Sequence, residues 1–197
     1  IPRFYDVTSG SIKIDGIDVR DFNIKTLRSK IGFIRQKTLL FTGSIKSNIK
    51  FGKRKASHEE MVHSAKVAQA YDFINKKEKK FDEPIGEGGS NVSGGQKQRL
   101  SIARALVRKP EIYIFDDSFS ALDFKTDAIL RAELKKETTH AIVLIVAQRI
   151  GSIMDADKII VLDEGNVVGI GKHKELLKTC SVYKEIALSQ LTEEELA

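Results

Sequence analysis

Apolar and polar positions along the chain form patterns that predict short strands alternating with amphipathic helices. Runs that are apolar, or that alternate with polar residues, predict strands at residues 11–15, 31–35, 112–115, 141–146 and 158–162. Apolar residues at helical spacing predict helices over residues 57–75, 93–107, 124–137, 172–178 and 182–189. This order of elements predicts an α/β fold.

Two of the predicted strands, Ile112–Phe115 and Ala141–Val146, are almost entirely apolar and rich in β-branched or aromatic residues. Strands that are buried on both faces, as in a parallel sheet covered by helices, have this pattern. We therefore expect both strands to lie inside a parallel sheet that is flanked by helices.

The helix predicted after residue 93 begins with two consecutive glycines. Ser93 and Gln96 have the spacing of a capping box, which by itself indicates only the start of a helix. Gly94 and Gly95 lie in the first turn, although glycine in a helix costs about 1 kcal/mol relative to alanine. Because the turn has no side chains there, its free N–H groups are open to an anion, which makes it a candidate phosphate site.

Two carboxylates, Asp116 and Asp117, directly follow the apolar strand Ile112–Phe115. Open α/β sheets bind their ligands at the carboxyl ends of parallel strands. A carboxylate at such a position can hold Mg²⁺, which prefers oxygen ligands and keeps several waters beside nucleotide phosphates. Taken alone, the pair is equally compatible with a polar exit from the strand.

Composition and charge narrow the classes of function. The 197 residues are 41% hydrophobic and 30% charged, which is typical of a globular domain, and the apolar runs are too short to span a membrane. The single cysteine, Cys180, excludes an internal disulfide and favours a reducing compartment. The net charge of +6 suggests nucleic acid as a partner. Because lysines alternate with glutamates over much of the chain, we expect a solvated or membrane-adjacent surface and no nucleic acid.

Several motifs, taken together, resemble those of ATP-binding-cassette (ABC) ATPases of the exporter type. Asn91–Arg99 resembles their signature motif, and Ile112–Asp116 resembles their Walker B strand. The other matching segments are Gln36 at the Q-loop position, Phe41–Ile45 with Asn48 and Glu87–Gly89 at exporter-type positions, and Ser120–Asp123 at the D-loop position. The matches occur in the family's order through nearly the whole chain.

The resemblance implies a RecA-like P-loop NTPase core, in which helices flank a parallel sheet, together with an ABC helical subdomain. The helical subdomain would cover about residues 37–106 and carry the signature at 91–99. Residues 1–36 and 107–197 would form the remainder of the core, so that 1–197 is one partial nucleotide-binding domain.

The resemblance also implies ATP and Mg²⁺ as cofactors, at sites shared between two such domains. Asp116 would hold Mg²⁺ through water, and Gln36 would reach the metal and the attacking water. Ser93, Gly94 and Gly95 would bind the γ-phosphate of nucleotide held by the partner domain. Gln36, Gln96 and Asp123 are the other expected nucleotide-binding residues. The transmembrane domain of the same transporter would be a second partner and would place the chain at the cytoplasmic face of the cell membrane.

One expected motif, Walker A, does not occur in these residues. Its pattern, GxxxxGK[ST], supplies the glycines and the lysine that hold the nucleotide phosphates. In the family it lies just upstream of the sequence that resembles residues 1–10, so we expect the chain to be truncated at its N-terminus. We expect such a fragment not to bind ATP in the usual mode. Since its sheet would lack a central strand, we also expect marginal stability or self-association.

Two candidate catalytic residues depart from the family's pattern. Asp117 occupies the position of the usual glutamate, and its side chain is one methylene shorter. Gln148 occupies the position of the switch-loop histidine, where an amide can donate a hydrogen bond but cannot carry a proton at neutral pH. Both changes would weaken hydrolysis at this domain's own site, whereas the signature is intact. The combination resembles the degenerate-site half of a heterodimeric exporter.

Three other functions remain as alternatives. DNA-repair and chromosome-maintenance ATPases share the signature and the D-loop, but a long coiled coil interrupts them between Q-loop and signature, where this sequence is compact. The exporter-type segments argue against the translation-factor relatives. The non-enzymatic alternative is a binding module that carries a signature and does not itself catalyse hydrolysis.

Overall fold

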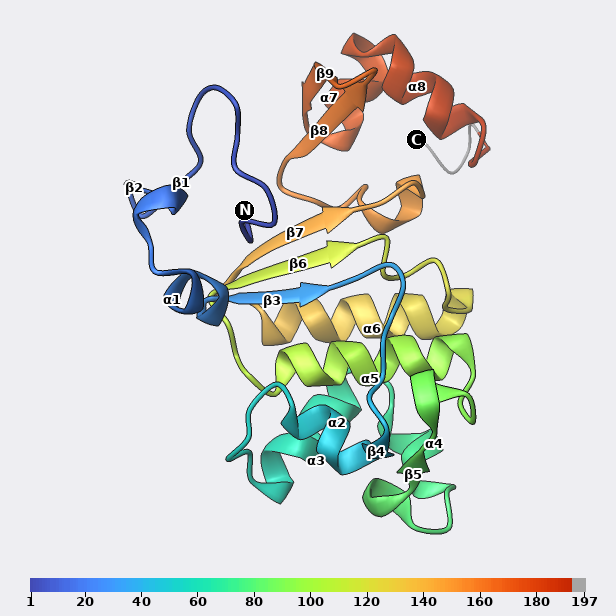
Figure 1. Cartoon of the computed structure of the whole chain (residues 1–197). Coiled ribbons are helices and arrows are strands. Elements are labelled where there is room, and N and C mark those ends of the chain that lie inside the picture. Colours follow the sequence, from blue (N-terminus) through green and yellow to red (C-terminus); the bar gives the residue numbers. More distant parts are fainter. Residues whose placement is uncertain (193–197) are drawn as a thin grey trace. The chain divides into compact units, whose positions relative to one another are not determined.

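The computed structural model describes residues 1–192, which fold as two compact units (Figure 1). Unit 1 comprises Ile1–Val146, and unit 2 begins at Ala147. The hydrophobic clusters of the two units contain different residues, so each unit has a core of its own. Within residues 1–192, no helix combines the length and the apolar character that a membrane span requires.

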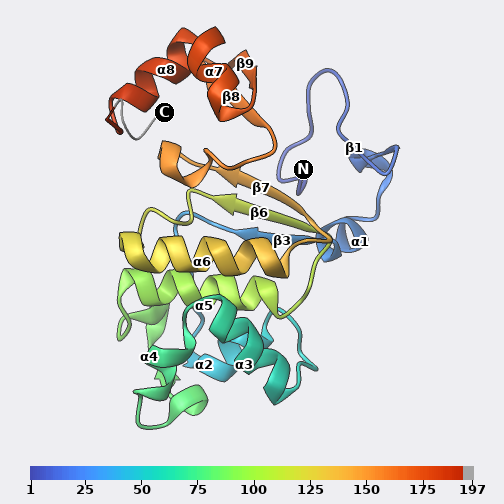
Figure 2. The ribbon, with the colours of Figure 1, turned by 180° about the vertical axis from the view of Figure 1, so that it is seen from behind.

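Unit 1 is built on a parallel three-stranded sheet with the strand order β3-β6-β7. These strands are β3 (Ile31–Ile34), β6 (Ile112–Asp116) and β7 (Ile142–Val146). Helices α5 (Gly94–Leu106) and α6 (Phe124–Glu137) lie along one face of the sheet in both views (Figures 1 and 2). The predicted α/β fold and the parallel sheet are confirmed.

The central strand β6 is buried on both faces because different elements cover each face. Tyr113 and Phe115 belong to the large core under α5 and α6. Ile112 and Ile114 belong to a smaller cluster on the opposite face, which includes Leu27. The elements that precede β3 are β1 (Lys13–Ile14), β2 (Ile17–Asp18), η1 (Val19–Asp21) and α1 (Ile24–Ser29). The strand predicted at residues 11–15 contains β1, which forms a hairpin with β2.

The prediction that both apolar strands are buried on both faces is wrong for β7. Ile142 is 61% exposed and Val146 is 57% exposed. Within residues 1–192, β7 pairs only with β6, and the smaller cluster covers β3 and β6 but not β7. The chain therefore presents an apolar strand at the sheet edge, while the expected self-association stays a prediction.

The segment between β3 and α5 forms a compact group of short elements that pack against α5. These are β4 (Gly43–Ser44), α2 (Ile45–Lys50), α3 (His58–Val67), α4 (Tyr71–Asn75), η2 (Lys80–Asp82), β5 (Pro84–Ile85) and η3 (Glu87–Gly89). Their apolar residues share the large core with α5 and the sheet. The boundaries proposed for a helical subdomain at residues 37 and 106 stay a prediction.

The single helix predicted over residues 57–75 is two helices, α3 and α4. A capping box of Ser57 and Glu60 starts α3. The helix α3 ends at Val67, and Gln69, two residues beyond, has a left-handed φ of 55°. The N–H of Ala70 donates to the carbonyl of Ala65 at 2.7 Å. This is a Schellman C-cap, which usually carries glycine at the left-handed position. Because this position carries glutamine, the amino-acid sequence does not indicate that the helix ends here.

Replacing Gln69 tests this left-handed position. We expect the Gln69→Gly variant to be about 1 kcal/mol more stable than the Gln69→Ala variant, because a Cβ atom is unfavourable at left-handed φ. Both variants lose the side-chain hydrogen bond to the carbonyl of Lys66, so their difference isolates the backbone contribution. Urea unfolding monitored by circular dichroism measures it. Equal stability of the two variants would contradict the assignment of this cap.

Unit 2 consists of an antiparallel hairpin and two helices. Its elements are η4 (Ile150–Ser152), β8 (Ile159–Asp163), β9 (Asn166–Gly171), α7 (His173–Thr179) and α8 (Ser181–Leu188). The strand predicted at residues 158–162 and both terminal helices are confirmed. Cys180 is buried in the core of this unit, and within residues 1–192 no group of His, Cys, Asp or Glu forms a metal-binding cluster.

Candidate nucleotide site

The glycine turn at the start of α5 is a well-formed helix N-terminus. The Ser93 hydroxyl accepts a hydrogen bond from the N–H of Gln96 at 3.3 Å, and the Gln96 side chain accepts one from the N–H of Ser93 at 3.2 Å. The predicted capping box is therefore present. Since the first four N–H groups of a helix have no partner within the helix, Gly94 and Gly95 keep donors at the positive end of the dipole.

Gly94 and Gly95 differ in why their positions are occupied by glycine. A Cβ atom built on Gly94 would meet no atom within 4 Å, so nothing within the chain requires glycine at this position. A Cβ atom on Gly95 would lie 3.2 Å from the carbonyl oxygen of Ala121, in the segment predicted as the D-loop. Gly95 therefore allows a close approach of the two segments. Gly94 leaves space above the helix end that a ligand could occupy.

The segment Ser120–Asp123 connects the strand carboxylates to α6. Asp123 caps α6 and accepts hydrogen bonds from the N–H of Thr126 at 2.9 Å and from its hydroxyl at 2.7 Å. These hydrogen bonds, the backbone one first, hold the pKa of Asp123 below its ordinary value. The hydroxyl of Ser120 donates to the carbonyl of Asp117 at 3.0 Å. The D-loop position is therefore a hydrogen-bonded turn beside the glycine turn of α5.

The structure brings two predicted site residues, Gln36 and Asp117, into direct contact. Gln36 follows β3 and Asp117 follows β6, and the Nε2 of Gln36 donates to the Oδ2 of Asp117 at 2.9 Å. The φ of Asp117 is 44°, a left-handed value that is uncommon for residues other than glycine. The hydroxyl of Ser118 donates to the carbonyl of Ile34 at 2.9 Å, which holds the ends of the two strands together.

The oxygen atoms at these strand ends suit a magnesium ion held partly through water. Asp116 and Asp117 are half-buried, and neither forms a salt bridge within residues 1–192. Gln36 adds an amide oxygen beside them. Carboxylate and amide oxygens of this kind fit Mg²⁺, which keeps several waters in such sites. Gln148 belongs to unit 2, where its carbonyl accepts from Gln190 at 2.7 Å, and its catalytic role stays a prediction.

Two residues of α5, Gln98 within the signature and Arg104 beyond it, hold the chain after β3, a role that no sequence motif predicted. Gln98 contacts Thr38 and the carbonyl of Arg35. Arg104 donates to the Leu39 carbonyl at 3.0 Å, and to the carbonyl and the side-chain oxygen of Asn48 at 2.9 and 2.7 Å. Burial lowers the pKa of Arg104 to about 10, so it remains charged at neutral pH.

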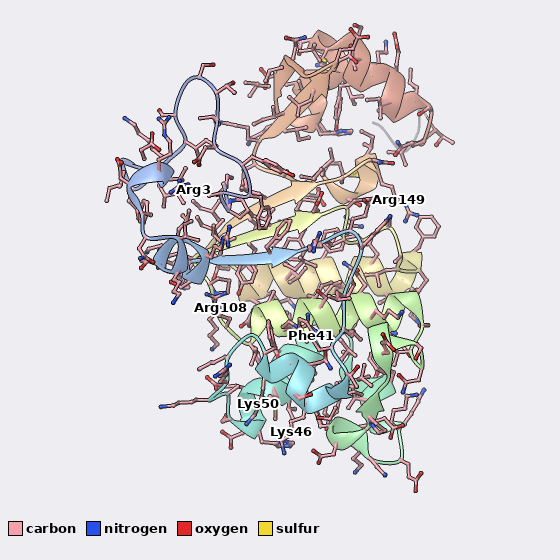
Figure 3. The ribbon with its side chains drawn as sticks, in the orientation of Figure 1. Arg3, Phe41, Lys46, Lys50, Arg108 and Arg149 are labelled. Atoms are coloured by element: carbon pink, nitrogen blue, oxygen red, sulfur yellow. The ribbon has the colours of Figure 1, made fainter. Side chains whose placement is uncertain are left out.

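Aromatic rings and arginines line a groove beside this segment, with a volume of about 360 Å³. The guanidinium of Arg104 lies 5.2 Å from the ring centre of Phe41 and 5.8 Å from that of Phe51. Three further arginines, at positions 28, 35 and 108, line the same groove; Figure 3 labels Phe41 and Arg108. A groove of this composition suits a polypeptide segment with apolar and acidic side chains.

These features fit the class of nucleotide-binding domains with a signature motif, and comparison with known proteins identifies the family. Residues 1–120 match the family model described as ABC transporter. The chain therefore belongs to the ABC transporter family.

Known relatives include an uncharacterized ABC transporter ATP-binding protein of Mycobacterium bovis, which is 43% identical over 193 residues, covering 96% of this chain and 33% of the relative. A Staphylococcus aureus ATP-binding/permease protein, whose name assigns it provisionally to multidrug export, is 44% identical over 186 residues, covering 94% and 32% of the two chains. The chain thus spans about a third of the length of these relatives.

The fold has a close counterpart among solved structures. A bacterial Atm1-family ABC exporter with ATP bound superimposes with a TM-score of 0.91 at 38% identity. The similarity covers 94% of this chain and 33% of the exporter chain. The α/β architecture expected from the motifs is therefore that of an ABC exporter domain.

Proposed function

We propose that the chain is part of the ATP-hydrolysing domain of an ABC exporter, which uses ATP to move a substrate across a membrane. The observation that carries this proposal is the open glycine turn of α5, which lies against the D-loop segment and leaves free space above Gly94. Family membership and the likeness to an ATP-bound exporter support it.

Each candidate residue has a role that suits its position. Asp116 would hold Mg²⁺ at the end of β6, and Gln36 would reach the metal and the attacking water. Bound Mg²⁺ supplies charge neutralisation for the transferred phosphoryl group. Asp117 accepts a hydrogen bond from the attacking water. Ser93, Gly94 and Gly95 donate hydrogen bonds to the γ-phosphate of nucleotide that a partner domain holds.

The partner in this proposal is a second, non-identical nucleotide-binding domain. Asp117 and Gln148 make this domain's own site slow, because the carboxylate reaches less far and the amide cannot take up a proton. The signature has no such change and completes the partner's site. A heterodimer with one slow and one active site follows from these two facts.

The membrane domain of the transporter is the second proposed partner, and it would bind at the groove beside Arg104. The groove offers apolar rings at Phe41 and Phe51 and positive charge from four arginines. A short helix with apolar and acidic side chains matches that surface. This contact would hold the domain at the cytoplasmic face of the membrane.

The alternatives have less support. The segment between Gln36 and Ser93 folds as short helices on α5 and forms no coiled coil, which argues against a DNA-repair or chromosome-maintenance role. A signature-bearing module without catalysis is distinguished by reconstitution with a partner domain that carries Walker A, glutamate and histidine.

The test is the ATPase activity of this chain's full subunit in membranes, alone and with its partner. We expect turnover from the heterodimer, little turnover from the subunit alone, and loss of turnover when Ser93 is replaced by arginine. Turnover by the subunit alone at the rate of the heterodimer would contradict the slow-site assignment. No turnover with any partner would favour the binding module.

A further inference from the structure

One buried amide connects the chain on either side of Gln36 to the helix that begins with the signature. Gln98 lies on α5, is 2% exposed, and stands two residues beyond Gln96. Its Oε1 accepts a hydrogen bond from the hydroxyl of Thr38, and its Nε2 donates to the carbonyl of Arg35 at 3.4 Å. Gln98 therefore holds the chain just before and just after Gln36.

Two further hydrogen bonds fix the chain on either side of Thr38. The amide of Gln36 reaches Asp117 at 2.9 Å, and Arg104 fixes the Leu39 carbonyl at 3.0 Å. Gln36 thus lies between a backbone attachment to α5 and a side-chain attachment to the end of β6. A shift of α5 would move the backbone of Gln36, and the same shift would move the glycine turn.

We propose that Gln98 is a positioning residue that sets the distance between the Gln36 amide and the glycine turn of α5. This inference rests on the proposed function, because it assigns Gln36 to one nucleotide site and the glycine turn to the other. Gln98 connects Gln36 in one site to the glycine turn in the other. Loss of its hydrogen bonds would therefore slow hydrolysis at whichever of the two sites turns over. Gln98 itself contacts no reacting atom and acts through Gln36 and the signature.

Two variants separate positioning from a contribution to core stability. Gln98→Leu removes the amide and leaves the Thr38 hydroxyl and the Arg35 carbonyl without their partner, which lowers stability. The double variant Thr38→Val with Gln98→Leu replaces the hydrogen-bonded pair by apolar groups of similar size, which can be nearly neutral. We expect the double variant to recover most of the melting temperature but not the attachment of the segment.

The first measurement uses the 197-residue chain. Arg35 and Lys37 are exposed trypsin sites within the held segment, so the rate of cleavage reports local opening. We expect cleavage after Lys37 to be about tenfold faster in both Gln98 variants. Ser64→Ala is the matched control, because it removes another buried hydrogen bond, to the Met61 carbonyl, without touching this segment. It should leave cleavage after Lys37 unchanged.

The second measurement uses the heterodimer. We expect kcat to fall about tenfold in the single and the double variant while the KM for ATP changes less than about twofold, because displacement of a catalytic group by ~1 Å lowers the rate without loss of ground-state binding. Thr38→Ser keeps the hydroxyl and should retain the wild-type kcat.

The outcomes separate the inference from the proposed function. A double variant with the wild-type melting temperature, cleavage rate and kcat would overturn the inference, since Gln98 would then only fill the core. Unchanged kcat despite faster cleavage would also overturn it. If the wild-type heterodimer has no ATPase activity, the proposed function fails, and slow cleavage in the double variant would still refute the positioning by Gln98.

Discussion

Replacing Gly94 by alanine is expected to lower ATP hydrolysis by the heterodimer roughly 100-fold, because the added methyl group would keep the phosphate away from the N–H donors of the turn, and losing one such preorganised contact typically costs that much. A Cβ atom at this position meets no atom within 4 Å of the same chain, so the folded domain can accommodate it. The methyl group instead occupies the space above the helix end that the phosphate would use. The variant therefore separates the ligand's requirement for glycine from that of the fold.

Stability and activity should move in opposite directions in this variant. Alanine is favoured over glycine within a helix, so the free energy of unfolding of Gly94→Ala should equal or exceed that of the wild type. Gly95→Ala should lower both activity and stability, because its Cβ atom would press on the carbonyl of Ala121 at 3.2 Å. Urea unfolding of the chain and steady-state ATPase assays of the heterodimer measure the two effects.

A second glycine with free space around its Cβ position serves as the control for the Gly94 variant. Gly151→Ala in unit 2 also adds a Cβ atom that meets nothing within 4 Å, and it should leave the activity near that of the wild type. If Gly94→Ala hydrolyses ATP at the wild-type rate, the glycine turn does not bind phosphate. The proposed function would then lose the observation that carries it.

Replacing Asp117 by glutamate is expected to raise hydrolysis at this domain's own site about 10- to 100-fold, because ~1 Å of catalytic placement can be worth on the order of 100-fold. The carboxylate of Asp117 now accepts a hydrogen bond from Gln36 at 2.9 Å. One additional methylene would extend it beyond this contact toward the attacking water. The gain should be largest when Gln148→His restores a group that can accept a proton.

The Asp117→Glu variant should also be less stable than the wild type. The φ of 44° at this position is tolerated better by aspartate than by most residues, so glutamate should lower the stability by about 1 kcal/mol. The measurement is single-turnover hydrolysis with the partner's own catalytic glutamate replaced by glutamine. Asp117→Asn is the control and should give no gain. An equal gain with asparagine would show that the charge at this position does not act on water.

Local patterns in the sequence predicted most of the elements of this chain correctly. Local residues form the capping boxes at Ser57 and Ser93 and the helix over residues 124–137. These features can therefore be recognised from short stretches of the sequence. The break at Gln69 was missed, because glutamine is not a typical residue for a left-handed helix cap. Its conformation is stabilised by burial of Ala65 and Ala70, which depends on tertiary packing.

The candidate site shows the same division between local and long-range information. The glycine turn, the strand carboxylates and the Q-loop glutamine could be identified from the amino-acid sequence, since each is a short motif. The contacts of Gln36 with Asp117, 81 residues away, and of Gln98 with Thr38, 60 residues away, depend on how the chain packs and could not be predicted from any motif. Packing also decides that β7 is exposed although its composition resembles that of the buried β6. Hydrophobic periodicity reports which face of an element is apolar, whereas the neighbour that covers that face is set by packing between distant parts of the chain.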